Sequence, residues 1–270
     1  MSVDSALLEP VLEHFGNLPE LPKASTTVLS LLGEIETTPE ELEQAVSTQP
    51  ALAATILRTI NSAQFGLHEE VRSLATAIQL MGFMHLRSLA MAAVIAQLRL
   101  DVPAEYSAER ERLWLHSMNV GIGARRLGER AGLMWSDEAF IAGVIHDCGR
   151  TVMLTRAPRE YGMLIRSRRR LPDCNVEQSA FGVDHAMVGA ALMQHWGMPE
   201  QLIATCAQHH RPIDPEQPHA ALLTLVALSD RFDAEIPAAE LKKNADAIGL
   251  RGLDLGVVCY DVRHVVAVER

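Results

Sequence analysis

Hydrophobic and polar positions follow the period of an α-helix along most of the chain. Val28, Leu31, Leu32 and Ile35, for example, have the i, i+3, i+4, i+7 spacing that gives a helix one apolar face. No segment shows the sustained two-residue alternation that is typical of half-buried strands. No unit repeats at a fixed interval of about 20–50 residues either. The pattern therefore predicts an all-α fold.

Start signals place several of these helices. Thr38, Pro39 and Glu41 have the spacing of a capping box with proline at the first helical position, and Pro50 opens the next apolar pattern. The segment Asp101-Val102-Pro103 is a plausible joint between two halves of the chain. Beyond the helices that begin near 39 and 50, the pattern predicts helices at about 73–81, 84–98, 105–131, 136–156, 158–170, 184–196, 199–210, 218–232 and 252–267.

Composition and charge exclude several classes of protein. With 24 Lys+Arg against 34 Asp+Glu, the net charge is −10, and aromatic residues make up only 4%. Binding of nucleic acid through a broad basic surface or an aromatic stacking platform is therefore not expected. The start of the chain lacks a signal-peptide pattern, and no apolar run approaches the about 18 residues of a membrane span. The absence of a Cys-x-x-Cys pair disfavours zinc-finger sites and secreted disulfide frameworks, so we expect a cytoplasmic protein with four reduced thiols: Cys148, Cys174, Cys206 and Cys259.

The 11 histidines differ in their sequence surroundings. Five of them, with two aspartates, share predicted helix faces with apolar residues, whereas the other six lack such company and are interpreted as surface or structural residues. His146 and Asp147 lie in the most apolar predicted helix, 136–156, where neighbouring residues differ by about 100° around the axis. The candidate constellation is His116, His146, Asp147, His185, His209, His210 and Asp230.

Two interpretations of the constellation are open. Burying an isolated carboxylate is costly, so inward aspartates need partners, and a bound cation can supply them. Imidazole and carboxylate ligands suit divalent zinc, iron, manganese or nickel better than calcium. Alternatively, the same residues form a buried polar network without metal. Seven such positions favour a metal site, since one inward histidine alone is more often a hydrogen-bonded core residue.

At these residues the sequence resembles the HD superfamily, and more specifically the HDOD domain proteins, which are bacterial relatives of the HD-GYP phosphodiesterases. The doublet stands in Val144-Ile145-His146-Asp147-Cys148-Gly149-Arg150. The resemblance extends over about residues 15–235 and includes Leu18-Pro19-Glu20-Leu21-Pro22, Gln49-Pro50-Ala51-Leu52, Asn61-Ser62-Ala63, Ala77-Ile78-Gln79-Leu80-Met81-Gly82, Phe181-Gly182-Val183-Asp184-His185 and His209-His210.

The resemblance implies a two-lobed helical module. Its segments would be an N-terminal lobe at 15–100, an HD-like metal-binding lobe at 101–235 and a C-terminal helical extension at 236–270. In HD enzymes the positions that match His116, His146, Asp147 and Asp230 bind a first metal. The positions that match His185, His209 and His210 complete a second site in two-metal members. The implied cofactor is one or two divalent ions of Fe, Mn, Zn or Ni.

Two departures bear on catalysis. The histidine pair continues as Arg211-Pro212-Ile213, without the Gly-Tyr-Pro signature of HD-GYP enzymes. The position that resembles the catalytic lysine is Arg150, and an arginine can clamp phosphate but rarely gives up a proton. In an active enzyme, Asp147 and Arg150 would be the catalytic residues.

Three functions follow as hypotheses. HDOD proteins are generally regarded as non-catalytic, which favours a signal-transduction module that keeps its metal and binds a protein partner through residues 15–100, or a phosphate-containing ligand. The alternative is a metal-dependent phosphohydrolase for a nucleotide or cyclic dinucleotide, in which the metal assists attack of water on phosphorus. Redox chemistry at a two-iron site is a third hypothesis, because His and carboxylate ligands also suit iron.

Overall fold

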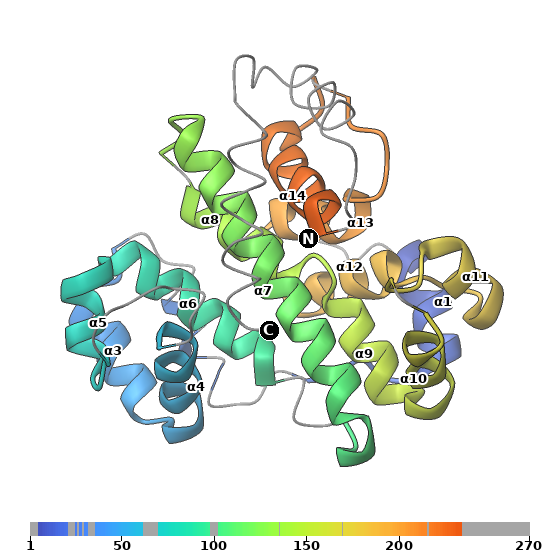
Figure 1. Cartoon of the computed structure of the whole chain (residues 1–270), viewed down its shortest axis with the longest axis horizontal. Coiled ribbons are helices and arrows are strands. Elements are labelled where there is room, and N and C mark those ends of the chain that lie inside the picture. Colours follow the sequence, from blue (N-terminus) through green and yellow to red (C-terminus); the bar gives the residue numbers. More distant parts are fainter. Residues whose placement is uncertain are drawn as a thin grey trace. The chain divides into compact units, whose positions relative to one another are not determined.

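The computed structural model describes residues 5–20, 25, 27–28, 30–31, 36–61, 70–97, 102–134, 136–168, 170–214 and 216–233. Across these ranges the regular structure is helical and no strand occurs, which confirms the predicted all-α class (Figure 1). Within the same ranges, no helix is both long enough and apolar enough to cross a membrane.

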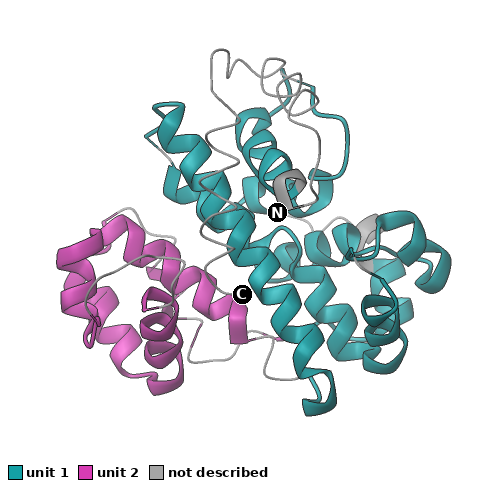
Figure 2. Ribbon diagram, viewed as in Figure 1, with its two compact units in different colours: residues 1–19, 98–262 teal, residues 20–97, 263–270 magenta. Residues whose placement is uncertain are grey.

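The chain divides into two compact units (Figure 2). Among the described residues, the smaller unit comprises residues 20–97, and the larger unit comprises residues 5–19 and 102–233. The boundaries predicted at 15–100, 101–235 and 236–270 remain predictions.

The smaller unit contains α3 (Pro39–Ser47), α4 (Pro50–Ile60), α5 (Leu74–Met81) and α6 (Phe83–Ala96). The predicted capping box is present, because Thr38 Oγ1 accepts from the backbone N–H of Glu41 and Glu41 Oε2 accepts from the backbone N–H of Thr38. Gly82 separates α5 from α6 with a φ of 84°, a backbone conformation that suits glycine. The helices bury an apolar core that includes Leu42, Leu52, Ile56, Ile60, Leu86 and Leu89.

The larger unit holds all seven residues of the candidate constellation. Its helices are α1 (Ser5–Phe15), the 3₁₀ turn η3 (Ala104–Tyr106), α7 (Ser107–Arg130), α8 (Ser136–Ile145), α9 (Cys148–Arg156), α10 (Pro158–Arg166), α11 (Cys174–Phe181), α12 (His185–His195), α13 (Glu200–Gln208) and α14 (Ala220–Asp233). Most lie within a few residues of the predicted ranges. Helices α1 and α11 have no counterpart among the predicted helices, and the helix predicted at 252–267 lies outside the described residues.

The prediction of one continuous helix over 136–156 is wrong. The structure has α8 and α9 instead, separated by a turn at His146 and Asp147. Asp147 leaves the helical region with φ −103° and ψ 15°, and α9 begins at the next residue. The two candidate side chains therefore project from a turn between two helices and not from the middle of one helix. The apolar pattern continues across this turn because both helices are buried, so it gives no sign of the break.

Close helix crossings hold this unit together. Helix α7 packs along α8 and α14, while α12 packs against α9 and α13. At the α9–α12 crossing, a Cβ on Gly149 would lie 2.0 Å from the backbone oxygen of His185, so only glycine allows this approach. The crossing thus brings the start of α9, next to Asp147, against the start of α12, which is His185.

Candidate metal centre

The structure brings all seven predicted residues to one place in the larger unit. His116 comes from α7, His146 and Asp147 from the turn between α8 and α9, and His185 from the first position of α12. The remaining three come from the end of α13 and from α14: His209, His210 and Asp230. Five segments that are far apart in the sequence therefore meet around Asp147.

One group of side chains gathers on the Oδ2 side of Asp147. The Nε2 atom of His116 lies 3.2 Å from Asp147 Oδ2, 3.3 Å from Asp230 Oδ1 and 3.3 Å from His146 Nε2. His146 Nε2 is 3.5 Å from Asp147 Oδ2 and 3.9 Å from Asp230 Oδ1. These four residues form the Asp230 group, which offers two carboxylates and two imidazoles.

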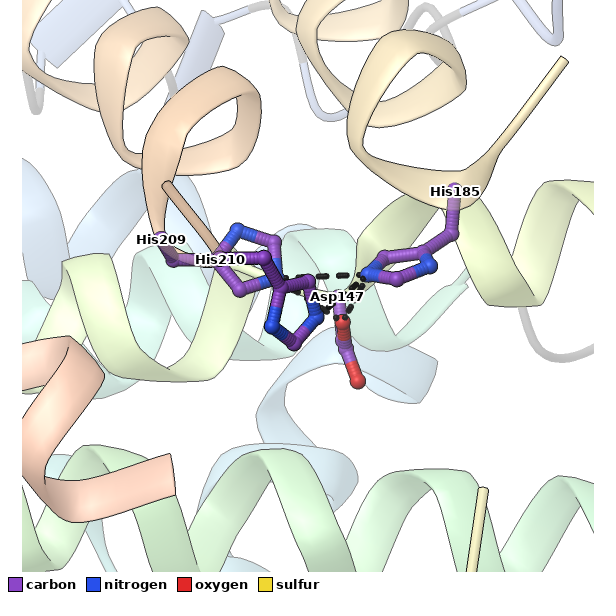
Figure 3. Close-up of side chains that lie close together, drawn as sticks. All are labelled: Asp147, His185, His209 and His210. Atoms are coloured by element: carbon purple, nitrogen blue, oxygen red, sulfur yellow. Dashed lines mark hydrogen bonds and ion pairs between the residues drawn. The ribbon is translucent and has the colours of Figure 1, made fainter. Parts of the chain in front are cut away.

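A second group gathers on the Oδ1 side of the same carboxylate (Figure 3). His185 Nε2 lies 3.1 Å and His209 Nε2 3.4 Å from Asp147 Oδ1. His185 Nε2 is also 3.3 Å from His209 Nε2 and 3.0 Å from His210 Nε2. Asp147, His185, His209 and His210 form the His210 group, whose one carboxylate is shared with the Asp230 group.

These spacings match the ligand set of a divalent ion. With metal–ligand distances of about 2.1 Å, adjacent ligand atoms are about 3.0 Å apart in an octahedron and about 3.4 Å apart in a tetrahedron. Buried Asp147 Oδ1 receives no hydrogen bond from any described residue, although two imidazole nitrogens face it. Nitrogens that approach an oxygen without donating to it have their lone pairs available for a shared cation. The donor set therefore suits a divalent metal.

Acceptors on the far side of three histidines select the tautomer that a ligand needs. Nδ1 of His146 faces the carbonyl oxygen of Gly143 at 2.6 Å, and Nδ1 of His209 faces that of Thr205 at 3.0 Å. Nδ1 of His185 lies 2.5 Å from Glu177 Oε2. A carbonyl or carboxylate oxygen accepts a hydrogen bond from Nδ1–H, which leaves the Nε2 lone pair directed at the centre. These bonds orient the imidazoles as a metal site requires.

Electrostatics keep most of the donors in the protonation states that metals bind. Burial lowers the pKa of His146 to about 4 and that of His210 to about 3, so both are neutral near pH 7. The pKa of Asp147 lies well below its ordinary value, because Arg150 and the surrounding histidines outweigh burial. The pKa of Asp230 is also lowered, since its contact with His116 outweighs burial. For His185, the carboxylates of Asp147 and Glu177 outweigh the effect of burial and raise the pKa.

Arg150 does not lie where a residue that binds a substrate phosphate would be expected. Its side chain is buried, and its Nε donates to Asp147 Oδ2 at 2.6 Å. Its Nη1 donates to Glu177 Oε1 at 2.7 Å and to the carbonyl oxygen of Pro172 at 2.6 Å, while Nη2 lies 3.3 Å from His185 Nε2. The guanidinium therefore contacts two of the candidate ligands, Asp147 and His185.

The sequence analysis missed Glu177 and Tyr161. Glu177 is fully buried on α11, where it bonds Arg150, His185 and Tyr161, whose hydroxyl donates to Oε1 at 2.6 Å. One signal was available: Glu177 and Phe181 are four residues apart, which puts the carboxylate on the apolar face of any helix there. Tyr161 gave no comparable signal.

The side chains of the centre differ in their exposure to solvent. The side chains of His146, His185 and His209 are fully buried, whereas those of Asp230 and His210 are 17% and 35% exposed. Asp230 and His210 are therefore more accessible to solvent than these three histidines.

Comparison with known proteins assigns the family. The sequence model of the HDOD domain matches residues 18–212, which is most of the chain. The chain belongs to the HDOD domain family. The resemblance noted in the motifs is thereby confirmed for this HDOD protein.

Individual relatives of the HDOD chain are distant. It is 26% identical over 250 residues to an uncharacterized protein of Treponema pallidum (strain Nichols), covering 88% of this chain but only 47% of the relative, so it spans about half of that protein's length. A solved HDOD domain protein of unknown function from Geobacter sulfurreducens matches with a TM-score of 0.75 and 22% identity, covering 97% of this chain and 92% of that one.

Two further solved structures share the fold of this HDOD chain. A protein named "Putative phosphohydrolase" from Shewanella amazonensis SB2B has a TM-score of 0.72 and 24% identity, covering 96% of this chain and 94% of that one. A "Putative signal transduction protein" from Marinobacter aquaeolei VT8 has a TM-score of 0.72 and 20% identity, covering 98% of this chain and 65% of that one. At these identities the likeness extends to the fold alone.

Proposed function

We propose that this HDOD protein is a metal-binding regulatory module that carries out signal transduction without turning over a substrate. His116, His146, Asp147, His185, His209, His210 and Asp230 are its candidate ligands, and a divalent cation held by them would tie together α7, the α8–α9 turn, α12, α13 and α14. Binding of the cation would thereby control the conformation that a partner protein recognises. That partner is a signalling protein that docks on residues 15–100.

The observation that carries this proposal is the set of buried hydrogen bonds that Arg150 makes. Arg150 is only 3% exposed, and its guanidinium donates to Asp147, Glu177 and the Pro172 carbonyl oxygen. Binding a substrate phosphate there would break buried charged hydrogen bonds and leave two carboxylates without their cationic partner, which is costly. Arginine also holds its proton too firmly to act as a general acid. Arg150 is thus suited to holding the centre together.

A second candidate function is hydrolysis of phosphate esters, such as a nucleotide or cyclic dinucleotide. The complete His/Asp set and the exposure of His210 and Asp230 favour this alternative, because a phosphate-containing ligand could reach the centre from that side. A bound metal would supply Lewis-acid stabilisation of charge on the phosphoryl oxygens.

One experiment separates the two functions. The purified protein is loaded with Mn²⁺ or Fe²⁺, its metal content is measured, and it is incubated with bis(p-nitrophenyl) phosphate, p-nitrophenyl phosphate and a panel of linear and cyclic dinucleotides. Asp147→Ala, purified in parallel, corrects for contaminating hydrolases. The proposal expects metal-loaded wild-type protein with no turnover above that of the variant. Turnover that needs metal and disappears in Asp147→Ala would contradict the proposal and establish the phosphohydrolase.

A further inference from the structure

The N-terminal segment of the larger unit, residues 5–19, is held by side chains at the ends of two other helices. Arg156 at the end of α9 donates through Nη2 to the carbonyl oxygen of Asn17 at 2.6 Å. Trp196, the residue that follows α12, donates through Nε1 to the carbonyl oxygen of Pro19 at 2.9 Å. Helix α1, within this segment, also packs against α12 (Figure 1). The segment is therefore fixed to the ends of α9 and α12.

A third contact joins the N-terminal segment to α11. Phe181, the last residue of this helix, lies with its ring centroid 5.6 Å from that of His14 and 6.0 Å from that of Phe15. The His14 ring meets it edge-on, an arrangement that is favourable for aromatic pairs. Phe181 also contacts Tyr161, with the two centroids 5.9 Å apart. The segment thus contacts the helix that carries Glu177.

The same three helices converge on the candidate metal centre. Helix α9 begins directly after Asp147, and α12 begins with His185. Glu177, one helical turn before Phe181 on α11, accepts from Arg150 and from the backbone N–H of His185. Each contact of the N-terminal segment is therefore one helix away from a candidate ligand or from the carboxylate that orients it.

These three helices are also tied to one another beside the centre. A Cβ on Gly149 would lie 2.0 Å from the backbone oxygen of His185, so the start of α9 lies directly against the start of α12. Glu177 joins α11 to both, because it bonds Arg150 on α9 and His185 on α12. Packed helices joined by buried hydrogen bonds are the kind of network that carries energetic coupling between sites. A change in the stability of the centre should therefore reach the N-terminal segment.

A bound cation would change that stability. The buried Oδ1 of Asp147 accepts no hydrogen bond from any described residue, which is costly in a protein interior. His185 and His209 face this oxygen at 3.1 and 3.4 Å without donating to it. A cation among these atoms would remove the cost without a large movement, because the spacings already suit its ligands. The coupling expected here acts through ordering of the helices and not through displacement.

We propose that the N-terminal segment is the read-out of the metal centre: cation binding and docking of residues 5–19 strengthen each other through α9, α11 and α12. The inference rests on the metal centre of the proposed function and names the element through which that centre acts. Residue 19 is followed directly by residue 20, where the smaller unit begins. Docking of the segment therefore sets how firmly the chain is held just before it enters that unit.

Hydrogen–deuterium exchange of the full-length protein, with Mn²⁺ and with a chelator, tests the coupling. Mn²⁺ should slow the exchange of peptides within residues 5–19 by at least about fivefold, the lower end of allosteric coupling. Peptides within residues 104–111 carry no candidate ligand and report stabilisation of the larger unit as a whole. They should gain less protection than the N-terminal segment.

Thermodynamic reciprocity gives a second measurement. If the cation strengthens docking, weaker docking must lower the cation affinity by the same factor. The double variant Arg156→Gln/Trp196→Phe removes both donors to the segment and leaves the candidate ligands intact. It should bind Mn²⁺ at least about fivefold more weakly and lose the extra protection. Arg159→Gln, at an exposed position on α10, is the matched control and should behave as the wild type.

The outcomes separate this inference from the metal centre on which it rests. No bound Mn²⁺ in the wild-type protein would refute both. Bound Mn²⁺ with equal protection at 5–19 and 104–111 would leave the metal centre standing and overturn the coupling, as would unchanged affinity in the folded double variant. If the double variant fails to fold, Arg156→Gln alone, at an exposed position, should show both effects in the same direction, and unchanged affinity and protection there would overturn the coupling.

Discussion

The carboxylate of Glu177 holds His185 at two points. Its Oε2 accepts from the backbone N–H of His185 at 2.8 Å and lies 2.5 Å from His185 Nδ1. One oxygen therefore fixes the start of α12 and the orientation of the imidazole at the same time. Its other oxygen accepts from Arg150 and Tyr161, so a single buried side chain joins α9, α10, α11 and α12.

Glu177→Gln should weaken metal binding without unfolding the protein. The amide retains one acceptor oxygen but loses the charge that favours the Nδ1–H tautomer of His185 and the ionised Asp147–Arg150 pair. Loss of such an outer-shell partner typically lowers metal affinity about 10–100-fold. Mn²⁺ titration measures the effect, with Glu160→Gln on the exposed face of α10 as the matched control. Equal affinities in the two variants would show that Glu177 has only a structural role.

Gly149→Ala should destabilise the larger unit. The added methyl group would lie 2.0 Å from the backbone oxygen of His185 and 2.6 Å from the backbone nitrogen of Gly189, and backbone atoms have little freedom to move away. Such overpacking costs about 3 kcal/mol. Urea unfolding followed by tryptophan fluorescence measures the loss, because Trp114 on α7 and Trp196 at the end of α12 both belong to this unit.

Gly189→Ala, at the same crossing of α9 and α12, is the control for Gly149→Ala. A Cβ on Gly189 would be 3.3 Å from the nitrogen of Gly149 and 3.4 Å from Cys148 Sγ, so it needs only a small adjustment. Alanine also has a higher helix propensity than glycine, by about 1 kcal/mol. Gly189→Ala should therefore be much less damaging than Gly149→Ala, and a larger loss in Gly189→Ala would contradict the packing described for α9 and α12.

The Glu109–Arg166 pair gives the larger unit a specific pH dependence. Arg166 donates to both carboxylate oxygens of Glu109, and this interaction lowers the pKa of Glu109 although burial opposes it. A group whose folded-state pKa is depressed stabilises the fold above its ordinary value of 4.5, and that contribution is lost as the pH falls through the folded-state value. Glu109→Gln should therefore be less stable than wild type at pH 7, with a smaller difference at pH 3.

Urea unfolding at several pH values tests that prediction, with Glu13→Gln on α1 as an exposed control. The control should follow the wild-type curve throughout. A constant difference between Glu109→Gln and wild type from pH 7 to pH 3 would mean that the carboxylate charge is not the source of the stabilisation.

Metal should raise the stability of the larger unit. The candidate ligands come from five segments that meet only in the folded state, so a cation would bind the folded state and not the unfolded chain. At a free metal concentration 100 times the Kd, the expected gain is about 2.7 kcal/mol. Thermal unfolding with Mn²⁺ and with a chelator measures this gain, which Asp147→Asn should abolish. An equal gain in Asp147→Asn would place the bound metal elsewhere.

The sequence predicted the helices well where one face is apolar and the start is marked. Thr38, Pro39 and Pro50 act through local backbone geometry, which a sequence reveals directly. The break at His146 and Asp147 was not predictable in this way, because apolar residues continue through both buried helices. Next to the break, Gly149 packs closely against α12, a contact between segments that are distant in the sequence.

The candidate site also combines features that the sequence reveals with contacts that depend on segments distant in the sequence. The seven predicted residues were recognisable because polar side chains on apolar faces and a family resemblance both identified them, and the structure brings them together. The role expected of Arg150 as a phosphate clamp is not supported by its contacts, since its guanidinium binds Asp147 and Glu177. The contact with Glu177 requires the position of α11, a helix that the hydrophobic pattern does not predict.

The central claim is that this His/Asp cluster holds a divalent cation, and X-ray absorption spectroscopy of the metal-loaded protein tests it most directly. With zinc bound, the account predicts a first shell of nitrogen and oxygen at about 2.0–2.2 Å, with the multiple scattering of imidazole rings. A first shell that contains sulfur at about 2.3 Å, or oxygen without imidazole, would contradict it.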